Sequence, residues 1–254
     1  EIKKQLINEG IKFDTTSDTE VLFRLLIFKG IKKTLNIIQG MFSFIFFDSK
    51  EKKICGARDH FGQKPFYYHK SNNEFLASTN IRPILKNIKK KTILNEDSIK
   101  QYLCSSGIIP PTKTFFRGIS TLPAGSYIIS YDERFIIKKY FKPIDLFKKE
   151  KYLALRNSDE EKIIKLLDSK IKKAVERHLI SDAKLAVTCS GGIDSSLITK
   201  YVNEKDKTIS ILTNTSEGIE KLSKIVPKII KKINISKKRT YFIKQKKIDY
   251  FNIL

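Results

Sequence analysis

A short segment in the second half of the chain, Ser190-Gly191-Gly192-Ile193-Asp194-Ser195-Ser196, has the residue types of a phosphate-binding loop. An apolar run at 185–187 that predicts a strand precedes it, and a predicted helix at 195–202 follows it. Glycines let the backbone come close to a ligand, and backbone N–H groups at a helix start attract anions. Because no Gly-Lys-Ser/Thr is present, this is not a Walker A loop. The alternative is an ordinary Gly-Gly turn in which Asp194 caps the helix.

The first half of the chain predicts a helix followed by antiparallel strands. Ser17-Asp18-Thr19-Glu20 has the pattern of an N-terminal capping box, and Gly30 is a suitable helix end. Another helix is expected over 95–104. Pairs of β-forming runs separated by short polar turns predict hairpins: 42–47 with 53–57, 65–68 with 74–78, and 127–129 with 135–137. Short turns imply antiparallel pairing, so this half predicts an α+β domain.

In the second half, predicted strands and helices alternate. Apolar residues recur at helical spacing over 163–179, and the runs at 185–187, 208–212 and 239–243 predict strands separated by helices at 195–202 and from Ile219. Pro227 should kink or split the last of these helices. The alternation predicts an α/β domain with a parallel sheet. We therefore expect two domains, 1–142 and 159–254, joined by a polar, lysine-rich linker.

The composition excludes several classes of protein. Hydrophobic residues make up 41% and charged residues 30% of the chain, which suits a soluble protein with packed cores. The longest apolar stretch, 41–47, is far shorter than the ~20 residues that a membrane span needs, and the charged first residues are not a secretory signal. Cys55, Cys104 and Cys189 are widely spaced, which argues against a disulfide framework and a structural zinc site. A cytoplasmic protein without a membrane partner is expected.

The chain is strongly basic, with 50 Lys+Arg against 27 Asp+Glu and a net charge of +23. A charge of this size raises the hypothesis of nucleic-acid binding. The lysines are spread over most of the chain, however, and the basic runs at 89–91, 231–232 and 237–239 are short and lack interleaved aromatic residues. A solvated surface is therefore the preferred interpretation, and a nucleic-acid partner is not expected.

The hexad from Ser190 to Ser195 resembles the pyrophosphate-binding loop of the PP-loop ATP pyrophosphatases, which cleave ATP between the α and β phosphates and adenylate an acceptor. The surrounding segments resemble one branch of that superfamily, the class B, glutamine-hydrolysing asparagine synthetases. These segments occur in the order of the family and extend over nearly the whole chain: 16–20, 40–44, 57–68, 109–111, Thr114, 122–125 and 178–182.

The resemblance implies a truncated N-terminal-nucleophile domain of the class II glutamine amidotransferase type, with αββα layers, followed by a partial PP-loop ATP pyrophosphatase domain. In that family a cysteine at the mature N-terminus attacks glutamine and releases ammonia. This chain begins with Glu1. We therefore expect an internal fragment that contains no catalytic residue, is inactive by itself, and lacks both that cysteine and the C-terminal part of the synthetase domain. Asp18 matches the aspartate that binds the α-amino group of glutamine; its alternative role is to favour the helix start electrostatically.

The same resemblance assigns an ATP site. The residues that match the pyrophosphate loop are Ser190, Gly191, Gly192, Asp194 and Ser195. Ile211 falls where the family has an apolar residue beside the adenine; the alternative is an ordinary sheet residue. Thr188-Cys189 and Pro227 depart from the family pattern. The metal ligands are not identified.

The reaction implied by the resemblance converts aspartate to asparagine. With ATP and Mg²⁺, aspartate forms β-aspartyl-AMP and pyrophosphate leaves, and ammonia from glutamine then displaces AMP. Three alternatives stay open: an asparagine-synthetase-like amidotransferase that acts on another carboxylate, a basic nucleic-acid-binding or tRNA-modifying PP-loop protein, and a non-catalytic remnant. A homodimer is also possible from the sequence alone.

Overall fold

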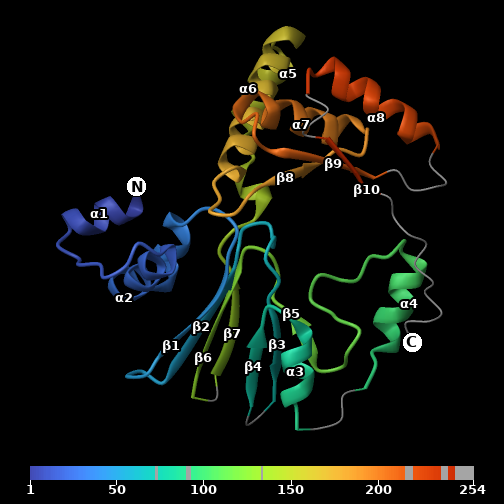
Figure 1. Ribbon diagram of the computed structural model, residues 1–254. Helices are drawn as coiled ribbons and strands as arrows, with labels where there is room; N and C mark the ends of the chain where they lie inside the picture. Colours follow the sequence, from blue (N-terminus) through green and yellow to red (C-terminus); the bar gives the residue numbers. More distant parts are fainter. Residues whose placement is uncertain (72–73, 90–92, 133, 215–219, 236–239, 244–254) are drawn as a thin grey trace. The chain divides into compact units, whose positions relative to one another are not determined.

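The computed structural model describes residues 1–71, 74–89, 93–132, 134–214, 220–235 and 240–243 (Figure 1). The chain divides into two compact units, Glu1–Phe147 (unit 1) and Lys148–Leu254 (unit 2). This division falls inside the segment expected to be a linker. The segment is not irregular, because it contains a 3-10 helix, Pro143–Leu146, and helix α5, Lys149–Arg156.

Unit 1 contains two antiparallel sheets. One has the order β1 (Ser43–Asp48), β2 (Lys53–Arg58), β6 (Ser126–Tyr131), β7 (Arg134–Lys139), and the other has the order β4 (Phe75–Ser78), β3 (Tyr67–Lys70), β5 (Ile119–Thr121). The predicted hairpins are confirmed as β1–β2, β3–β4 and β6–β7. The sequence does not predict β5, because its three residues are too few to show a period.

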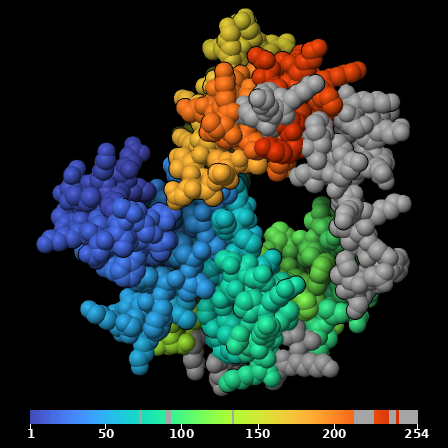
Figure 2. Space-filling model, viewed as in Figure 1, coloured from blue at the N-terminus to red at the C-terminus, as the bar shows by residue number. Residues whose placement is uncertain are grey.

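Buried side chains define the layers of unit 1. Helix α2 (Asp18–Ile37) packs on one face of the four-stranded sheet through Leu35 and Tyr127. Side chains alternate along a strand, so Ile128 points to the opposite face, where it packs with Phe66 and Leu122 against the three-stranded sheet. Helix α3 (Ile81–Asn87) contacts β3 and β4. Helix α4 (Glu96–Cys104) confirms the helix predicted at 95–104, and α1 (Ile2–Asn8) joins α2 in a lobe at the surface of the unit (blue in Figure 2).

Gly30 divides α2 into two helical segments that meet at a kink. Its φ of 68° and ψ of 167° are not helical, yet the helix resumes and continues to Ile37. The predicted stop at Gly30 is therefore confirmed as the end of a first helical segment, and the sequence does not predict the second segment that follows it. Ile31 and Leu35 pack on the sheet, and Leu35 is fully buried. Burial of a leucine contributes about 1.5–3 kcal/mol, which favours a second helical segment after the glycine.

The segment at 57–68 forms a tightly bonded corner between the two sheets. The carboxylate of Asp59 is fully buried and accepts hydrogen bonds from the backbone N–H groups of Phe61, Gln63 and Lys64, at 3.1, 2.9 and 2.9 Å. The guanidinium of Arg58 donates to three carbonyl oxygens of the same region. Buried polar groups are stable only when they are bonded in this way, so these two residues have a structural role.

Unit 2 is built on a parallel sheet, as the sequence predicts. Strands β8 (Ala186–Thr188), β9 (Ser210–Asn214) and β10 (Thr240–Ile243) pair in parallel in the order β10, β9, β8. Helices α6 (Glu160–His178) and α7 (Ile193–Lys205) share a core cluster that includes Val175 and Val202. Helix α8 (Glu220–Lys232) contributes Val226 and Ile230 to a second cluster.

Pro227 lies inside α8 and does not split it, so of the two predicted effects, a kink or a split, the split is wrong. A proline in a helix removes one backbone hydrogen bond and costs about 3 kcal/mol. Its neighbours Val226 and Ile230 are buried against the sheet, and this packing holds the helix continuous from Glu220 to Lys232.

Candidate functional site

Asp18, the proposed glutamine ligand, is the first residue of α2. Ser17 is the N-cap, and its hydroxyl accepts the backbone N–H of Thr19 at 3.2 Å. Thr19 Oγ1 lies 3.5 Å from Asp18 Oδ1, and this exposed carboxylate has no other partner among the described residues. The helix start therefore presents a carboxylate that is free to bind a cationic group.

The predicted capping box does not form, because Glu20 bonds to residues further back. Glu20 Oε1 accepts the N–H of Asp14 at 2.9 Å, and Oε2 accepts both the N–H and the hydroxyl of Thr15 at 2.7 Å. These hydrogen bonds, with the hydroxyl of Thr15 contributing most, lower the pKa of Glu20 to about 2. Glu20 therefore fixes the segment before Asp18 and does not cap Ser17.

Arg24 completes this group of side chains. Its Nη2 lies 3.1 Å from Asp14 Oδ2 and 3.2 Å from Glu20 Oε1. Thr15 Oγ1 also accepts the N–H of Ser17 at 3.2 Å. The capping-box pattern is defined by two residues three positions apart. The bonds described here join residues up to ten positions apart. The pattern therefore does not predict the roles of Asp14, Thr15 and Arg24.

The cysteines do not supply an evident nucleophile. Cys55 is buried in β2, and burial raises the pKa of its thiol. A raised pKa keeps the thiol protonated and unreactive. Cys189 is also buried, and its N–H bonds to Leu212 O at 2.8 Å. Cys104 is exposed at the last residue of α4.

The segment at 190–196 follows β8 and leads into α7, as predicted, but the helix begins at Ile193, two residues before the predicted start, so 193–196 form its first turn. Gly191 has a φ of 85°, a conformation that other residues adopt only with strain. Ser195 Oγ accepts the N–H of Ser190 at 3.2 Å and lies 3.0 Å from Ser190 Oγ. The hydroxyls of Ser195 and Ser196 donate to Gly192 O, at 3.2 and 2.6 Å. These bonds fold the loop over the start of the helix and bring the two predicted serines together.

Gly192 is the N-cap of α7 and has no side chain to cap it. An added Cβ would meet only Ser190 Oγ, at 3.8 Å, so the space above this residue is open. Asp194 is the second residue of the helix and is exposed. The alternative in which Asp194 caps the helix is therefore wrong. Its carboxylate still interacts favourably with the helix dipole.

Ile211 is fully buried in the sheet, in agreement with the alternative stated for it. It pairs with Val187 and Thr240 and packs in one cluster with Cys189 and Val226. Its side chain has no exposed surface for an adenine to contact. We assign Ile211 to the core of unit 2.

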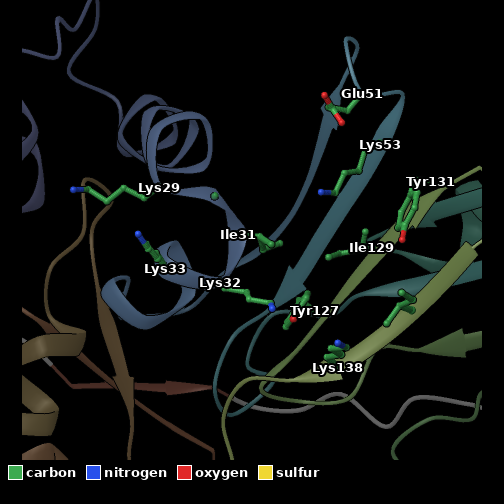
Figure 3. A pocket seen from close by; sticks show the side chains of 12 residues that line it. Lys29, Ile31, Lys32, Lys33, Glu51, Lys53, Tyr127, Ile129, Tyr131 and Lys138 are labelled. Carbon is green, nitrogen blue, oxygen red and sulfur yellow. The ribbon is translucent and has the colours of Figure 1, made fainter.

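A groove of about 600 Å³ in unit 1 does not include the predicted site residues (Figure 3). It lies between α2 near Gly30 and strands β2, β6 and β7, with Tyr127 and Ile129 in its lining. Lys32 extends from α2 toward Tyr127, whereas Lys29 and Lys33 extend away from the strands (Figure 3). Because this lysine-rich lining holds none of the predicted site residues, we do not assign the candidate site to this groove.

Comparison with known proteins connects both halves of the chain to one family. Residues 1–141 match the glutamine amidotransferase domain, and residues 166–242 match asparagine synthase. A putative glutamine-hydrolyzing asparagine synthetase 2 of Methanocaldococcus jannaschii is 31% identical over 77% of this chain and 37% of its own length. Glutamine-hydrolyzing asparagine synthetase 1 of Bacillus subtilis is 29% identical over 89% of this chain and 37% of its own length. Amidase chyE of Penicillium rubens is 28% identical over 85% of this chain and 31% of its own length.

These matches define the class of protein as one that joins a glutamine amidotransferase domain to an asparagine synthase domain. Since the relatives match across both units, the chain belongs to the glutamine-hydrolyzing asparagine synthetase family. It spans about a third of the length of these relatives. Among the described residues, no helix is long and apolar enough to cross a membrane.

Proposed function

We propose that this chain provides a glutamine-binding part and an ATP-binding loop to an enzyme that amidates aspartate to asparagine. The observation that supports this most directly is the loop at 190–196. It combines a glycine at a φ of 85°, open space at Gly192, two bonded serines and a helix start after a parallel strand. In open parallel sheets, ligands bind at the carboxyl ends of the strands.

Unit 1 would bind the ammonia donor. The exposed carboxylate of Asp18 suits the α-ammonium group of glutamine, because a charged acceptor opposite a charged donor gives a strong hydrogen bond. The helix and paired sheets of unit 1 are consistent with the αββα fold of N-terminal-nucleophile amidotransferases. We assign the nucleophile to none of the cysteines of this chain, because Cys55 and Cys189 are buried and Cys104 ends a helix.

Unit 2 would bind ATP through its phosphates. Ser190 and Ser195 would donate hydroxyl hydrogen bonds, and the backbone at Gly191 and Gly192 would approach the phosphate oxygens. Mg²⁺ would neutralise phosphate charge, and it needs few protein ligands when phosphates coordinate it. The exposed carboxylate of Asp194 is the side chain of this loop that suits that ion.

The proposed reaction has two steps. An oxygen of the aspartate β-carboxylate attacks the α-phosphorus of ATP, the bond to the bridging oxygen breaks, and pyrophosphate leaves with the formation of β-aspartyl-AMP. Ammonia from glutamine then attacks the β-carbonyl carbon, AMP leaves with the bonding electrons, and the nitrogen loses a proton to give asparagine. The phosphate loop would act in the first step by stabilising charge on the leaving pyrophosphate.

A second candidate is amidation of another carboxylate. The similarity to Amidase chyE, whose name gives no asparagine activity, supports keeping this candidate. The two candidates share the loop and Asp18, and they differ only in the acceptor.

The test is a product balance on the full-length protein with ATP, glutamine and Mg²⁺. With aspartate present, we expect pyrophosphate, AMP, glutamate and asparagine in equal amounts. If pyrophosphate forms with another carboxylate but not with aspartate, the second candidate is correct. The absence of pyrophosphate with every carboxylate tested would remove the ligase proposal.

A further inference from the structure

We infer that Glu20 is a positioning residue of the glutamine site: its carboxylate holds residues 14–17 so that Asp18 faces its ligand. This inference rests on the proposed function, because it takes Asp18 as the ligand of the glutamine ammonium group.

Glu20 binds the segment before the helix through three hydrogen bonds, and Arg24 of α2 through a fourth. Its two carboxylate oxygens accept the N–H of Asp14, the N–H of Thr15 and the hydroxyl of Thr15, at 2.9, 2.7 and 2.7 Å. The side chain is only 12% exposed. The helix cap is provided separately, by the hydroxyl of Ser17 on the N–H of Thr19. Glu20 therefore joins the entering segment to Arg24 of α2 and takes no part in the helix cap.

Thr15 transmits this restraint to the residue next to Asp18. Its Oγ1 donates to Glu20 Oε2 and accepts the N–H of Ser17 at 3.2 Å. Lys3 Nζ also donates to Thr15 O, at 2.6 Å. The backbone at 15–17 is thus fixed at several points. Because Asp18 follows directly and is the first residue of α2, its backbone is held by this segment on one side and by the helix on the other.

Arg24 offsets the negative charge of Glu20 and Asp14. Its guanidinium pairs with both Glu20 and Asp14, so the carboxylate most enclosed in the group has a cationic partner. Asp18 has no such partner among the described residues. The two carboxylates therefore have different roles. The carboxylate of Glu20 is paired with Arg24 and positions the segment, whereas the carboxylate of Asp18 is unpaired and available to an ammonium ligand.

The test is Glu20→Gln in the full-length protein. Glutamine keeps the length of the side chain but replaces one accepting oxygen by an NH₂ group, which cannot accept a hydrogen bond. Loss of the bonds to one oxygen should move Asp18 enough to raise the KM for glutamine about tenfold. We expect kcat to change less than twofold, and synthesis from free ammonia to be unchanged. Glu9→Gln is the matched control, since Glu9 pairs with Lys29 of the same helix without touching residues 14–18.

Thr15→Val is a second variant that tests the same connection. It keeps the shape of the side chain and removes the hydroxyl that joins Glu20 to Ser17. It should also raise the KM for glutamine and leave ammonia-dependent synthesis unchanged. If both variants lower the two activities equally and leave the KM for glutamine unchanged, Glu20 has a structural role only, and the inference is wrong.

The double variant Asp18→Asn/Glu20→Gln separates this inference from the proposed function. If Glu20 acts through Asp18, the KM of the double variant should equal that of Asp18→Asn alone. Additive effects would overturn the inference. If Asp18→Asn raises the KM and Glu20→Gln does not, only this inference is wrong. If Asp18→Asn leaves the KM unchanged, the glutamine role of Asp18 is wrong, and the positioning role is wrong with it.

Discussion

Gly192→Val should abolish ATP chemistry while leaving the fold intact. Gly192 has a φ of −75° and a ψ of 164°, an extended conformation that valine adopts readily. A Cβ at this position would meet only Ser190 Oγ at an ordinary contact distance of 3.8 Å. Replacing an N-cap glycine by an apolar residue costs about 0.5–1 kcal/mol. For a chain of this size that lowers Tm by about 1–4 °C.

The effect on phosphate binding should be much larger. The valine methyl groups would occupy the open space through which the backbone at 191–192 approaches a phosphate. Each hydrogen bond lost to a charged group costs about 1.5–3 kcal/mol, so the loss of two costs about 3–6 kcal/mol. This lowers the rate of pyrophosphate release by at least about 100-fold. Gly191 is a poorer choice, because its φ of 85° adds backbone strain to any substitution.

The assay measures pyrophosphate and glutamate in parallel on the full-length variant, with circular dichroism as the fold check. Glutamate release should persist, because it belongs to unit 1. Gly192→Ala should give a smaller loss, since it adds only the Cβ. Ile198→Ala, at an exposed position of the same helix, should change neither product. Normal pyrophosphate release from a folded Gly192→Val protein would refute the assignment of this loop to ATP.

Three further predictions concern unit 1. Asp18→Asn should raise the KM for glutamine, at a cost of about 1.5–3 kcal/mol, and leave ammonia-dependent synthesis nearly unchanged. The pKa of Glu20 is lowered from 4.5 to about 2, so its ionised form stabilises the fold fully above pH 4.5, and this stabilisation is lost as the pH falls through about 2. The urea midpoints of wild type and Glu20→Gln should therefore converge between these two values. Gly125→Ala should destabilise the fold by more than the about 1–3 kcal/mol of a strained φ, because its Cβ would lie 2.6 Å from Phe141 O.

Each of these predictions has a result that contradicts it. Equal loss of glutamine-dependent and ammonia-dependent synthesis in Asp18→Asn would make Asp18 a structural residue. A constant difference in urea midpoint from pH 7 to 2 would show that the Glu20 bonds do not persist in solution. Gly10→Ala is the control for Gly125→Ala, because Gly10 has a φ of 83° with no atom near its Cβ position. If the two variants lose equal stability, the contact at Phe141 is not a source of destabilisation.

The sequence determines the local elements and the family of this protein. The hairpins β1–β2, β3–β4 and β6–β7 follow from β-forming runs and polar turns, which are properties of neighbouring residues. The alternation that predicts the parallel sheet of unit 2 is equally local. The glycines of the loop at 190–196 are visible in the sequence because a ligand-approaching turn needs residues without a side chain.

The tertiary structure decides the features that depend on distant partners. A second helical segment follows the break at Gly30, because Ile31 and Leu35 pack on the sheet. The side chain of Ile211 is buried in the core, because β9 is the central strand and Ile211 packs with the α8 residue Val226. Glu20 bonds to Asp14 and Thr15 and not to the helix cap, because the entering chain folds back over it. Local patterns set the type of each element, but burial and hydrogen-bond partners come from segments far apart in the sequence, and only the folded chain brings them together.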